Sequence, residues 1–185
     1  MRKMNKALIQ RLTEGNRRYC LNSDREGREQ TALHGQKPWA IVVACSDSRV
    51  IPEEIFDVSL GELFVIRVAG NVLDNHQLGS IEYAAAHLGC GLVIVLGHTR
   101  CGAVDAALHG ESDGFIRYIT DEIAAAIGEE RDPLRACEKN VLHAAAHIRR
   151  EFAEHPEVGE ARIIGAVYDV FSGEVRYLDG EEANS

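Results

Sequence analysis

Four short apolar segments constrain the fold of this 185-residue chain more strongly than any other feature of its sequence. Each is almost entirely apolar and has the length of one strand, and they are residues 40–44, 63–68, 92–96 and 162–167. A strand that is apolar along its whole length, rather than at alternate positions, is typical of a parallel sheet covered on both faces. The sequence therefore predicts a mostly parallel central sheet.

Helical patterns separate these segments. Residues 78–88 carry apolar side chains every three or four positions and are followed by Gly89, which favours a helix end. Residues 115–127 and 133–152 are also predicted helices, and residues 171–175 predict a turn into a short last strand. This alternation predicts an α/β fold with right-handed crossovers, helices flanking the sheet on both faces and a short extra edge strand.

The N-terminal segment is predicted to be a helical arm. Residues 3–19 have apolar side chains at roughly helical spacing, whereas residues 22–36 are charged and are predicted to form a loop. No repeat, low-complexity tract or linker divides the chain. We expect one domain over residues 1–185, made of the helical arm and loop (1–36) and an α/β core (37–180).

Composition disfavours several classes of partner. The formal net charge of −9 argues against binding to nucleic acid or to anionic membranes. The apolar segments are too short to span a bilayer, and no apolar run of signal-peptide length follows Met1, so we expect a cytoplasmic protein. The five cysteines are irregularly spaced, which argues against a disulfide framework; they are Cys20, Cys45, Cys90, Cys101 and Cys137.

Two segments rich in reactive side chains directly follow predicted strands. Residues 45–49 (Cys-Ser-Asp-Ser-Arg) follow the first strand, and residues 97–102 (Gly-His-Thr-Arg-Cys-Gly) follow the third. Ligands of open parallel sheets bind at the carboxyl ends of the strands, so we expect these segments to meet. His98 and Cys101 lie three positions apart across a turn that opens a helix, where both side chains can face one atom. A helix N-terminus also favours the thiolate form of Cys101.

Cys45, His98 and Cys101 form a ligand set for Zn²⁺, because two thiolates and one imidazole suit this borderline ion. Three protein ligands leave a fourth position open, as in catalytic rather than structural zinc sites. A closed structural site would need a further cysteine, and Cys90, before the third strand, is expected in the core instead.

Asp47 and Arg49 lie beside the first of these ligands. The Arg49 guanidinium can hold the Asp47 carboxylate in one orientation through two charge-assisted hydrogen bonds. A carboxylate held in this way is able to accept the proton of a zinc-bound water or hydroxide. The pair therefore predicts catalysis rather than a structural site, which has no use for it.

In the two segments 45–49 and 97–102, the sequence resembles the β-class carbonic anhydrases. The resemblance rests on the two motifs and their flanks, and it covers residues 44–50, 61–67, 80–84, 97–102 and 165–170. It implies reversible hydration of CO₂ to bicarbonate and a proton through zinc-bound hydroxide. It also implies that Cys45, His98 and Cys101 bind the zinc and that Asp47 and Arg49 are the catalytic dyad.

The same resemblance assigns a substrate pocket. Gln36 matches an amide that binds a substrate oxygen, Phe64 and Tyr83 match pocket residues, and the backbone N–H of Gly102 is expected beside the substrate. In the family the Gln, Phe and Tyr come from the neighbouring subunit. The resemblance therefore implies a homodimer or a higher homo-oligomer.

Some β-class members adopt a closed form at low pH, in which the aspartate of the dyad, here Asp47, becomes a zinc ligand. The bicarbonate-regulated members carry Trp three residues before the first ligand Cys and Gly directly before it. Here these places hold Val42 and Ala44. We therefore expect the open form at neutral pH, with Asp47 paired with Arg49.

Two other functions remain open at the level of sequence. A hydrolase of CS₂ or COS on the same scaffold would carry the same ligands, and a non-catalytic zinc protein that binds a partner is a second alternative. A zinc deaminase is not supported, because His109-Gly110-Glu111 is not followed by the Pro-Cys-x-x-Cys segment of that class.

Overall fold

The computed structural model describes residues 2–155, 158 and 160–178, with the side chains of residues 2–4 left out. The chain separates into two units, Met1–Gln36 and Lys37–Ser185, which are described separately. The first unit contains the helices α1 (Arg2–Asn22) and α2 (Arg25–His34). The predicted N-terminal helix is therefore present.

The prediction of a loop over residues 22–36 is wrong, because most of this segment is α2. Its first turn is capped by Asp24, whose side chain accepts a hydrogen bond of 2.9 Å from the Gly27 amide. Arg25 and Glu29 then form an ion pair one turn apart at 2.8 Å. No side chain of α2 is buried, so the apolar periodicity that usually reveals a helix is missing from its sequence.

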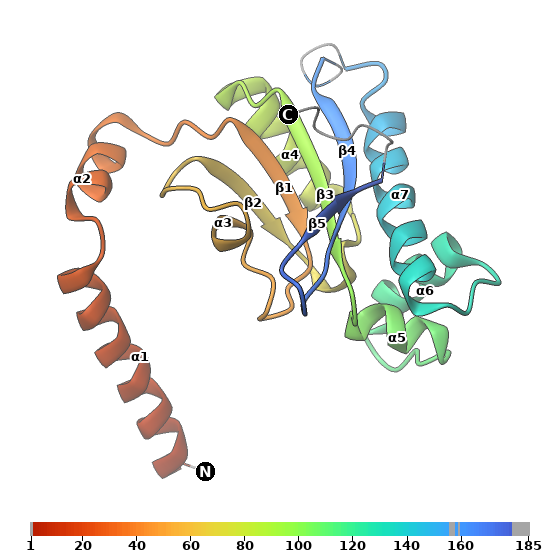
Figure 1. The fold of residues 1–185 in the computed structure, drawn as a ribbon, viewed down its shortest axis with the longest axis horizontal. Helices are drawn as coiled ribbons and strands as arrows, with labels where there is room; N and C mark the ends of the chain where they lie inside the picture. Colours follow the sequence, from red (N-terminus) through yellow and green to blue (C-terminus); the bar gives the residue numbers. More distant parts are fainter. Residues whose placement is uncertain (1, 156–157, 159, 179–185) are drawn as a thin grey trace. The chain divides into compact units, whose positions relative to one another are not determined.

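The second unit is built around a five-stranded sheet (Figure 1). Its strands are β1 (Ala40–Ala44), β2 (Leu63–Arg67), β3 (Leu92–His98), β4 (Arg162–Tyr168) and β5 (Val175–Tyr177). Their spatial order in the sheet is β2-β1-β3-β4-β5. The first four strands pair in parallel, and β5 is antiparallel to β4 at one edge. The predicted fold class is confirmed, including the short extra edge strand.

The two long helices of the second unit pack on one face of the sheet. They are α4 (Asn75–Leu88) and α7 (Pro133–Glu151), and their apolar side chains share one buried cluster with Ile41, Val43, Val93 and Val95. On the opposite face, the one-turn helix α3 (Pro52–Ile55) and the residues after it pack against Ala40, Val42 and Ala44. The strand β1 is fully buried, as its continuous apolar sequence predicts.

Helix α7 approaches the sheet closely at two glycines. A Cβ atom on Gly97 of β3 would lie 2.4 Å from Val141 Cγ2, and one on Gly165 of β4 would lie 2.9 Å from Val141 Cγ1. Real Cβ atoms do not approach other atoms so closely, so the absence of side chains creates the space that Val141 fills. This contact fixes α7 directly behind the carboxyl half of β3.

The carboxyl ends of β1 and β3 form the edge that matters for function. The chain leaves β1 toward β2 on one side, while β3 pairs with β1 on the other, so the strand order reverses between these two ends. Around this edge lie η1 (Ala69–Asn71), α5 (Gly102–Leu108) and α6 (Arg117–Ile127). Among the helices of the described residues, none is long and apolar enough to cross a membrane.

Candidate metal centre

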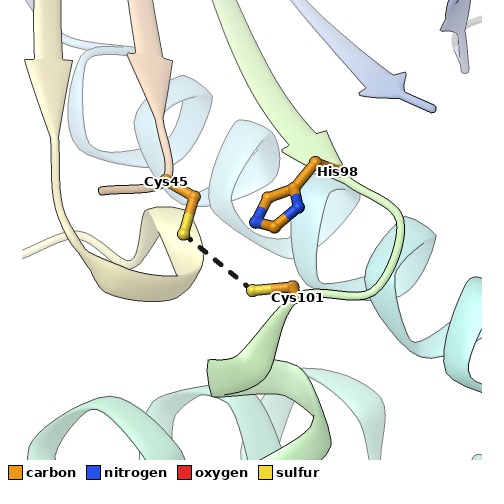
Figure 2. Close-up of side chains that lie close together, drawn as sticks. All are labelled: Cys45, His98 and Cys101. Carbon is orange, nitrogen blue, oxygen red and sulfur yellow. Dashed lines mark hydrogen bonds between the residues drawn. The ribbon is translucent and has the colours of Figure 1, made fainter. Parts of the chain in front are cut away.

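Cys45, His98 and Cys101 converge at the carboxyl ends of β1 and β3 (Figure 2). Cys45 directly follows β1, His98 is the last residue of β3, and Cys101 directly precedes α5. One ligand atom of each residue lies within 4.8 Å of the other two, and the two sulfur atoms are 3.9 Å apart. All three side chains are buried. The structure thus brings together the three ligands predicted from the sequence.

A tight turn returns the chain from His98 to Cys101. Arg100 adopts a positive φ of 56°, a conformation that side-chain-bearing residues rarely adopt. The amide of Thr99 donates to Tyr168 O at 2.9 Å, and the Thr99 hydroxyl accepts from the Val170 amide at 3.1 Å. These contacts with the end of β4 hold the turn in place.

The orientation of the His98 ring fits a metal ligand. Its Nδ1 atom lies 2.9 Å from Thr99 O, and because a carbonyl oxygen only accepts, Nδ1 carries the proton. The other nitrogen, Nε2, then presents a lone pair; it is buried and has no hydrogen-bond partner among the described residues. A buried imidazole nitrogen without a partner beside two thiols is the arrangement expected for a Zn²⁺ ligand.

The thiols of Cys45 and Cys101 interact strongly with each other. A hydrogen bond from Cys101 lowers the pKa of Cys45 to about 4, because it stabilises the Cys45 thiolate. The pKa of Cys101 is raised far above its usual value, since Cys101 keeps the proton that it donates to Cys45 and since it is buried. Two thiolates at this separation need a cation between them, so ionisation of both is coupled to metal binding.

Asp47 and Arg49 form a bidentate pair beside the ligands. Arg49 Nε lies 2.9 Å from Asp47 Oδ1, Arg49 Nη2 lies 2.7 Å from Asp47 Oδ2, and the Arg49 amide also donates to Oδ1 at 3.0 Å. These bonds hold the pKa of Asp47 well below its usual range. Asp47 Oδ2 is also 3.9 Å from His98 Nε2, so the ionised carboxylate faces the ligand group.

Three contributors to this site were not singled out in the sequence. The Arg67 side chain donates to Cys45 O at 3.1 Å and to Asp47 O at 2.7 Å, and thereby holds the segment that carries the first ligand. The Gly70 amide donates to Cys45 Sγ at 3.3 Å. Arg49 Nη2 donates to Arg100 O at 3.1 Å, which ties the two ligand segments together. Arg67 is the one charged residue in its apolar segment, a signal that could have revealed it.

The predicted pocket residues do not all lie at the metal ligands of their own chain. Phe64 pairs with Ile41 in the sheet, four positions before Cys45, and its ring lies 6.2 Å from that of Tyr83. Gln36 belongs to the first unit, and its role stays a prediction. Gly102, in contrast, follows Cys101 directly and lines a pocket of about 360 Å³.

The remaining buried cysteines lie outside the ligand group. The Cys90 thiol donates to Pro38 O at 3.1 Å, and burial raises its pKa. The Cys137 thiol donates to His98 O at 3.0 Å, and burial raises its pKa to about 11. Both are protonated core residues, as expected for Cys90.

Comparison with known proteins identifies the family. A family model described as carbonic anhydrase matches residues 40–175. The carbonic anhydrase of Mycolicibacterium smegmatis is 38% identical over 182 residues, covering 89% of this chain and 88% of that protein. Carbonic anhydrase 2 of Mycobacterium tuberculosis is 42% identical over 127 residues, which cover 63% of this chain and only 61% of that relative.

Solved structures give the same result. The β-carbonic anhydrase CcaA matches with a TM-score of 0.79 and 26% identity, covering 96% of this chain and 94% of the other. A structure described as tetrameric β-carbonic anhydrases of Sordaria macrospora matches with a TM-score of 0.64 and 25% identity, covering 97% and 98%. The chain belongs to the β-class carbonic anhydrase family.

Proposed function

We propose that this chain is a zinc-dependent carbonic anhydrase that hydrates CO₂ reversibly to bicarbonate and a proton. The observation that carries the proposal is the convergence of Cys45, His98 and Cys101 at one edge of the sheet, with a carboxylate fixed beside them. Family membership supports the same reaction. When bound by these residues, Zn²⁺ supplies the Lewis acidity that makes a water molecule nucleophilic near neutral pH.

Asp47 and Arg49 would orient the nucleophile. Arg49 occupies both oxygens of Asp47 and keeps the carboxylate ionised, so Asp47 acts only as a hydrogen-bond acceptor. An acceptor at this position binds the O–H of the attacking water and turns an oxygen lone pair toward the carbon of CO₂. The hydrogen bond from Arg49 Nη2 to Arg100 O holds the Asp47–Arg49 pair beside the segment that carries the other two proposed ligands, His98 and Cys101.

The substrate pocket would be completed by a second copy of the chain. Gly102 would donate its backbone N–H to a substrate oxygen, while Gln36, Phe64 and Tyr83 would come from the partner. Tyr83 is 48% exposed in the described chain, as expected for a side chain that meets another subunit. The tetrameric relatives of Sordaria macrospora are consistent with assembly.

Stopped-flow measurement of CO₂ hydration by the zinc-loaded protein tests this function. We expect hydration that is lost when the metal is removed by a chelator and regained when Zn²⁺ is returned. Turnover of CS₂ is measured in parallel. Zinc-dependent turnover of CS₂ without CO₂ hydration would assign the chain to the alternative hydrolase, and a zinc-loaded protein inactive on both would contradict the proposal.

A further inference from the structure

The Cys45 sulfur has a polar neighbour in addition to the other ligands. The Gly70 amide donates a buried hydrogen bond of 3.3 Å to Cys45 Sγ. Hydrogen bonds to a metal-bound sulfur fix its direction and withdraw part of its negative charge, and they therefore tune the metal that it holds. Gly70 lies in the short turn η1, between β2 and α4.

Glycine alone does not hold this amide in place. Gly70 has φ +67° and ψ 14°, a left-handed conformation, and glycine exchanges readily between this region and others. A Cβ atom here would lie 2.7 Å from Ile123 Cδ1 and 3.1 Å from Ala103 Cβ, so glycine is needed for room as well. Within the turn, the Asn71 amide donates to Val68 O at 2.9 Å, and a contact from outside the turn can further fix the direction of the Gly70 amide.

Asn140 of α7 supplies this contact. Its Nδ2 atom donates a hydrogen bond of 2.8 Å to Gly70 O, and the residue is only 2% exposed. Gly70 is thus held at its carbonyl by Asn140 while its amide faces the sulfur.

The position of Asn140 is itself well determined. The next residue, Val141, fills the space left by Gly97 and Gly165, which fixes α7 against β3 and β4 at this level. A buried donor on a rigid helix can restrain a flexible turn, because any movement of the turn would leave both polar groups without a partner.

We propose that Asn140 is a positioning residue of the metal centre, which raises metal affinity by keeping the Gly70 amide directed at the Cys45 sulfur. The proposal rests on the proposed zinc site and deepens it. Asn140 contacts neither the substrate nor the ligand atoms, and it acts through Gly70 alone.

The test compares Asn140→Leu, which has similar size but no donor, with the wild-type chain. Competition with a chromogenic chelator should give a dissociation constant for Zn²⁺ that is about 10- to 100-fold higher in the variant. The thiolate-to-metal charge-transfer band of the Co²⁺-loaded variant should shift relative to that of the wild type. The control is Thr120→Val, because Thr120 is also buried but its hydroxyl donates within its own helix, to Ile116 O at 3.3 Å.

Two further measurements guard against a variant that does not fold. Asn140→Asp keeps the shape of the side chain, and at a pH where its carboxylate is ionised it cannot donate to Gly70 O, so it should then also weaken zinc binding. In the wild-type chain loaded with ¹¹³Cd, the Gly70 amide proton should show a scalar coupling to the metal through the hydrogen bond to sulfur.

The outcomes separate this inference from the proposed function. Folded Asn140 variants with wild-type zinc affinity and an unchanged Co²⁺ spectrum would overturn the role of Asn140, as would a missing ¹¹³Cd coupling in the wild type. Equal loss of affinity in Thr120→Val would assign the effect to general destabilisation and overturn it too. A wild-type chain that binds no Zn²⁺ would overturn the metal site itself.

Discussion

At the scale of residues, the chemistry of this site depends on one histidine nitrogen, two cysteine sulfurs and one carboxylate. His98 presents a buried nitrogen without a hydrogen-bond partner among the described residues, and it faces two cysteines whose sulfur atoms lie 3.9 Å apart. Asp47 stands beside this group, and Arg49 binds both oxygens of its carboxylate. In the proposed function, three of these groups bind the metal and two orient the nucleophile.

Cys101→Ser should lose most of the bound zinc, because a neutral hydroxyl is a poor substitute for a thiolate. Elemental analysis of the purified variant measures the zinc content per chain. The matched control is Cys90→Ser, which removes another buried thiol but keeps a donor for Pro38 O, and it should retain its zinc. Full zinc occupancy in Cys101→Ser would remove this residue from the ligand set.

Asp47→Asn and Arg49→Ala should retain zinc but lose CO₂ hydration by about 10²- to 10⁴-fold, the range typical of groups that handle protons. Each change removes the orientation of the nucleophile without removing a ligand. Stopped-flow rates and zinc content are measured on the same samples. Arg176→Ala, which breaks an arginine–carboxylate pair with Glu138, is the control and should keep its activity. Unchanged rates in either dyad variant would show that the pair has no catalytic role.

At the scale of elements, the packing of α7 on the sheet holds backbone groups of the site in position. Val141 occupies the space beside Gly97, and Gly97 directly precedes the ligand His98. The same helix places Cys137 against His98 O and Asn140 against Gly70 O. One helix–sheet contact thus fixes two backbone groups that lie next to ligands.

Gly97→Ala should lower the free energy of unfolding by about 1–3 kcal/mol, because the new methyl group would overlap with Val141. Denaturant unfolding measures the change. In a Val141→Ala background the same substitution should cost less, since the overlapping atoms have been removed. Gly79→Ala in α4 is the control: a Cβ there has no neighbour within 4 Å, so stability should not fall. Equal costs in both backgrounds would contradict the proposed overlap.

At the scale of the whole molecule, we propose that two chains form the substrate pocket. Phe64 of β2 pairs with Ile41, three positions before the end of β1, and its ring lies 6.2 Å from that of Tyr83. The active protein is therefore expected to be a dimer or a larger assembly.

Sedimentation of the zinc-loaded protein should show at least a dimer, and a complementation experiment tests the shared pocket. Cys101→Ser and the double variant Phe64→Ala/Tyr83→Ala should each be impaired alone. Heterodimers obtained by co-expression should regain activity, because one of their two sites combines intact ligands with intact pocket residues. An active monomer, or heterodimers without any gain, would exclude the shared pocket.

The sequence by itself determined the four parallel strands and the three residues of the candidate metal centre, because both depend on local pattern. Continuous apolar runs define buried strands, and residues that directly follow neighbouring parallel strands meet at one edge of the sheet. Helix α2 was not predicted from the sequence, because none of its side chains is buried and no apolar periodicity marks it. Instead, a cap and an ion pair stabilise this helix.

Only the tertiary structure decided how the ligands are held. Arg67 reaches Cys45 O from 22 positions away, Gly70 reaches Cys45 Sγ from 25, and Asn140 reaches Gly70 O from 70. None of these contacts leaves a periodic signal, since each depends on how separate elements pack. The residue types of the candidate metal centre follow from local chemistry, whereas the groups that orient them follow from the fold.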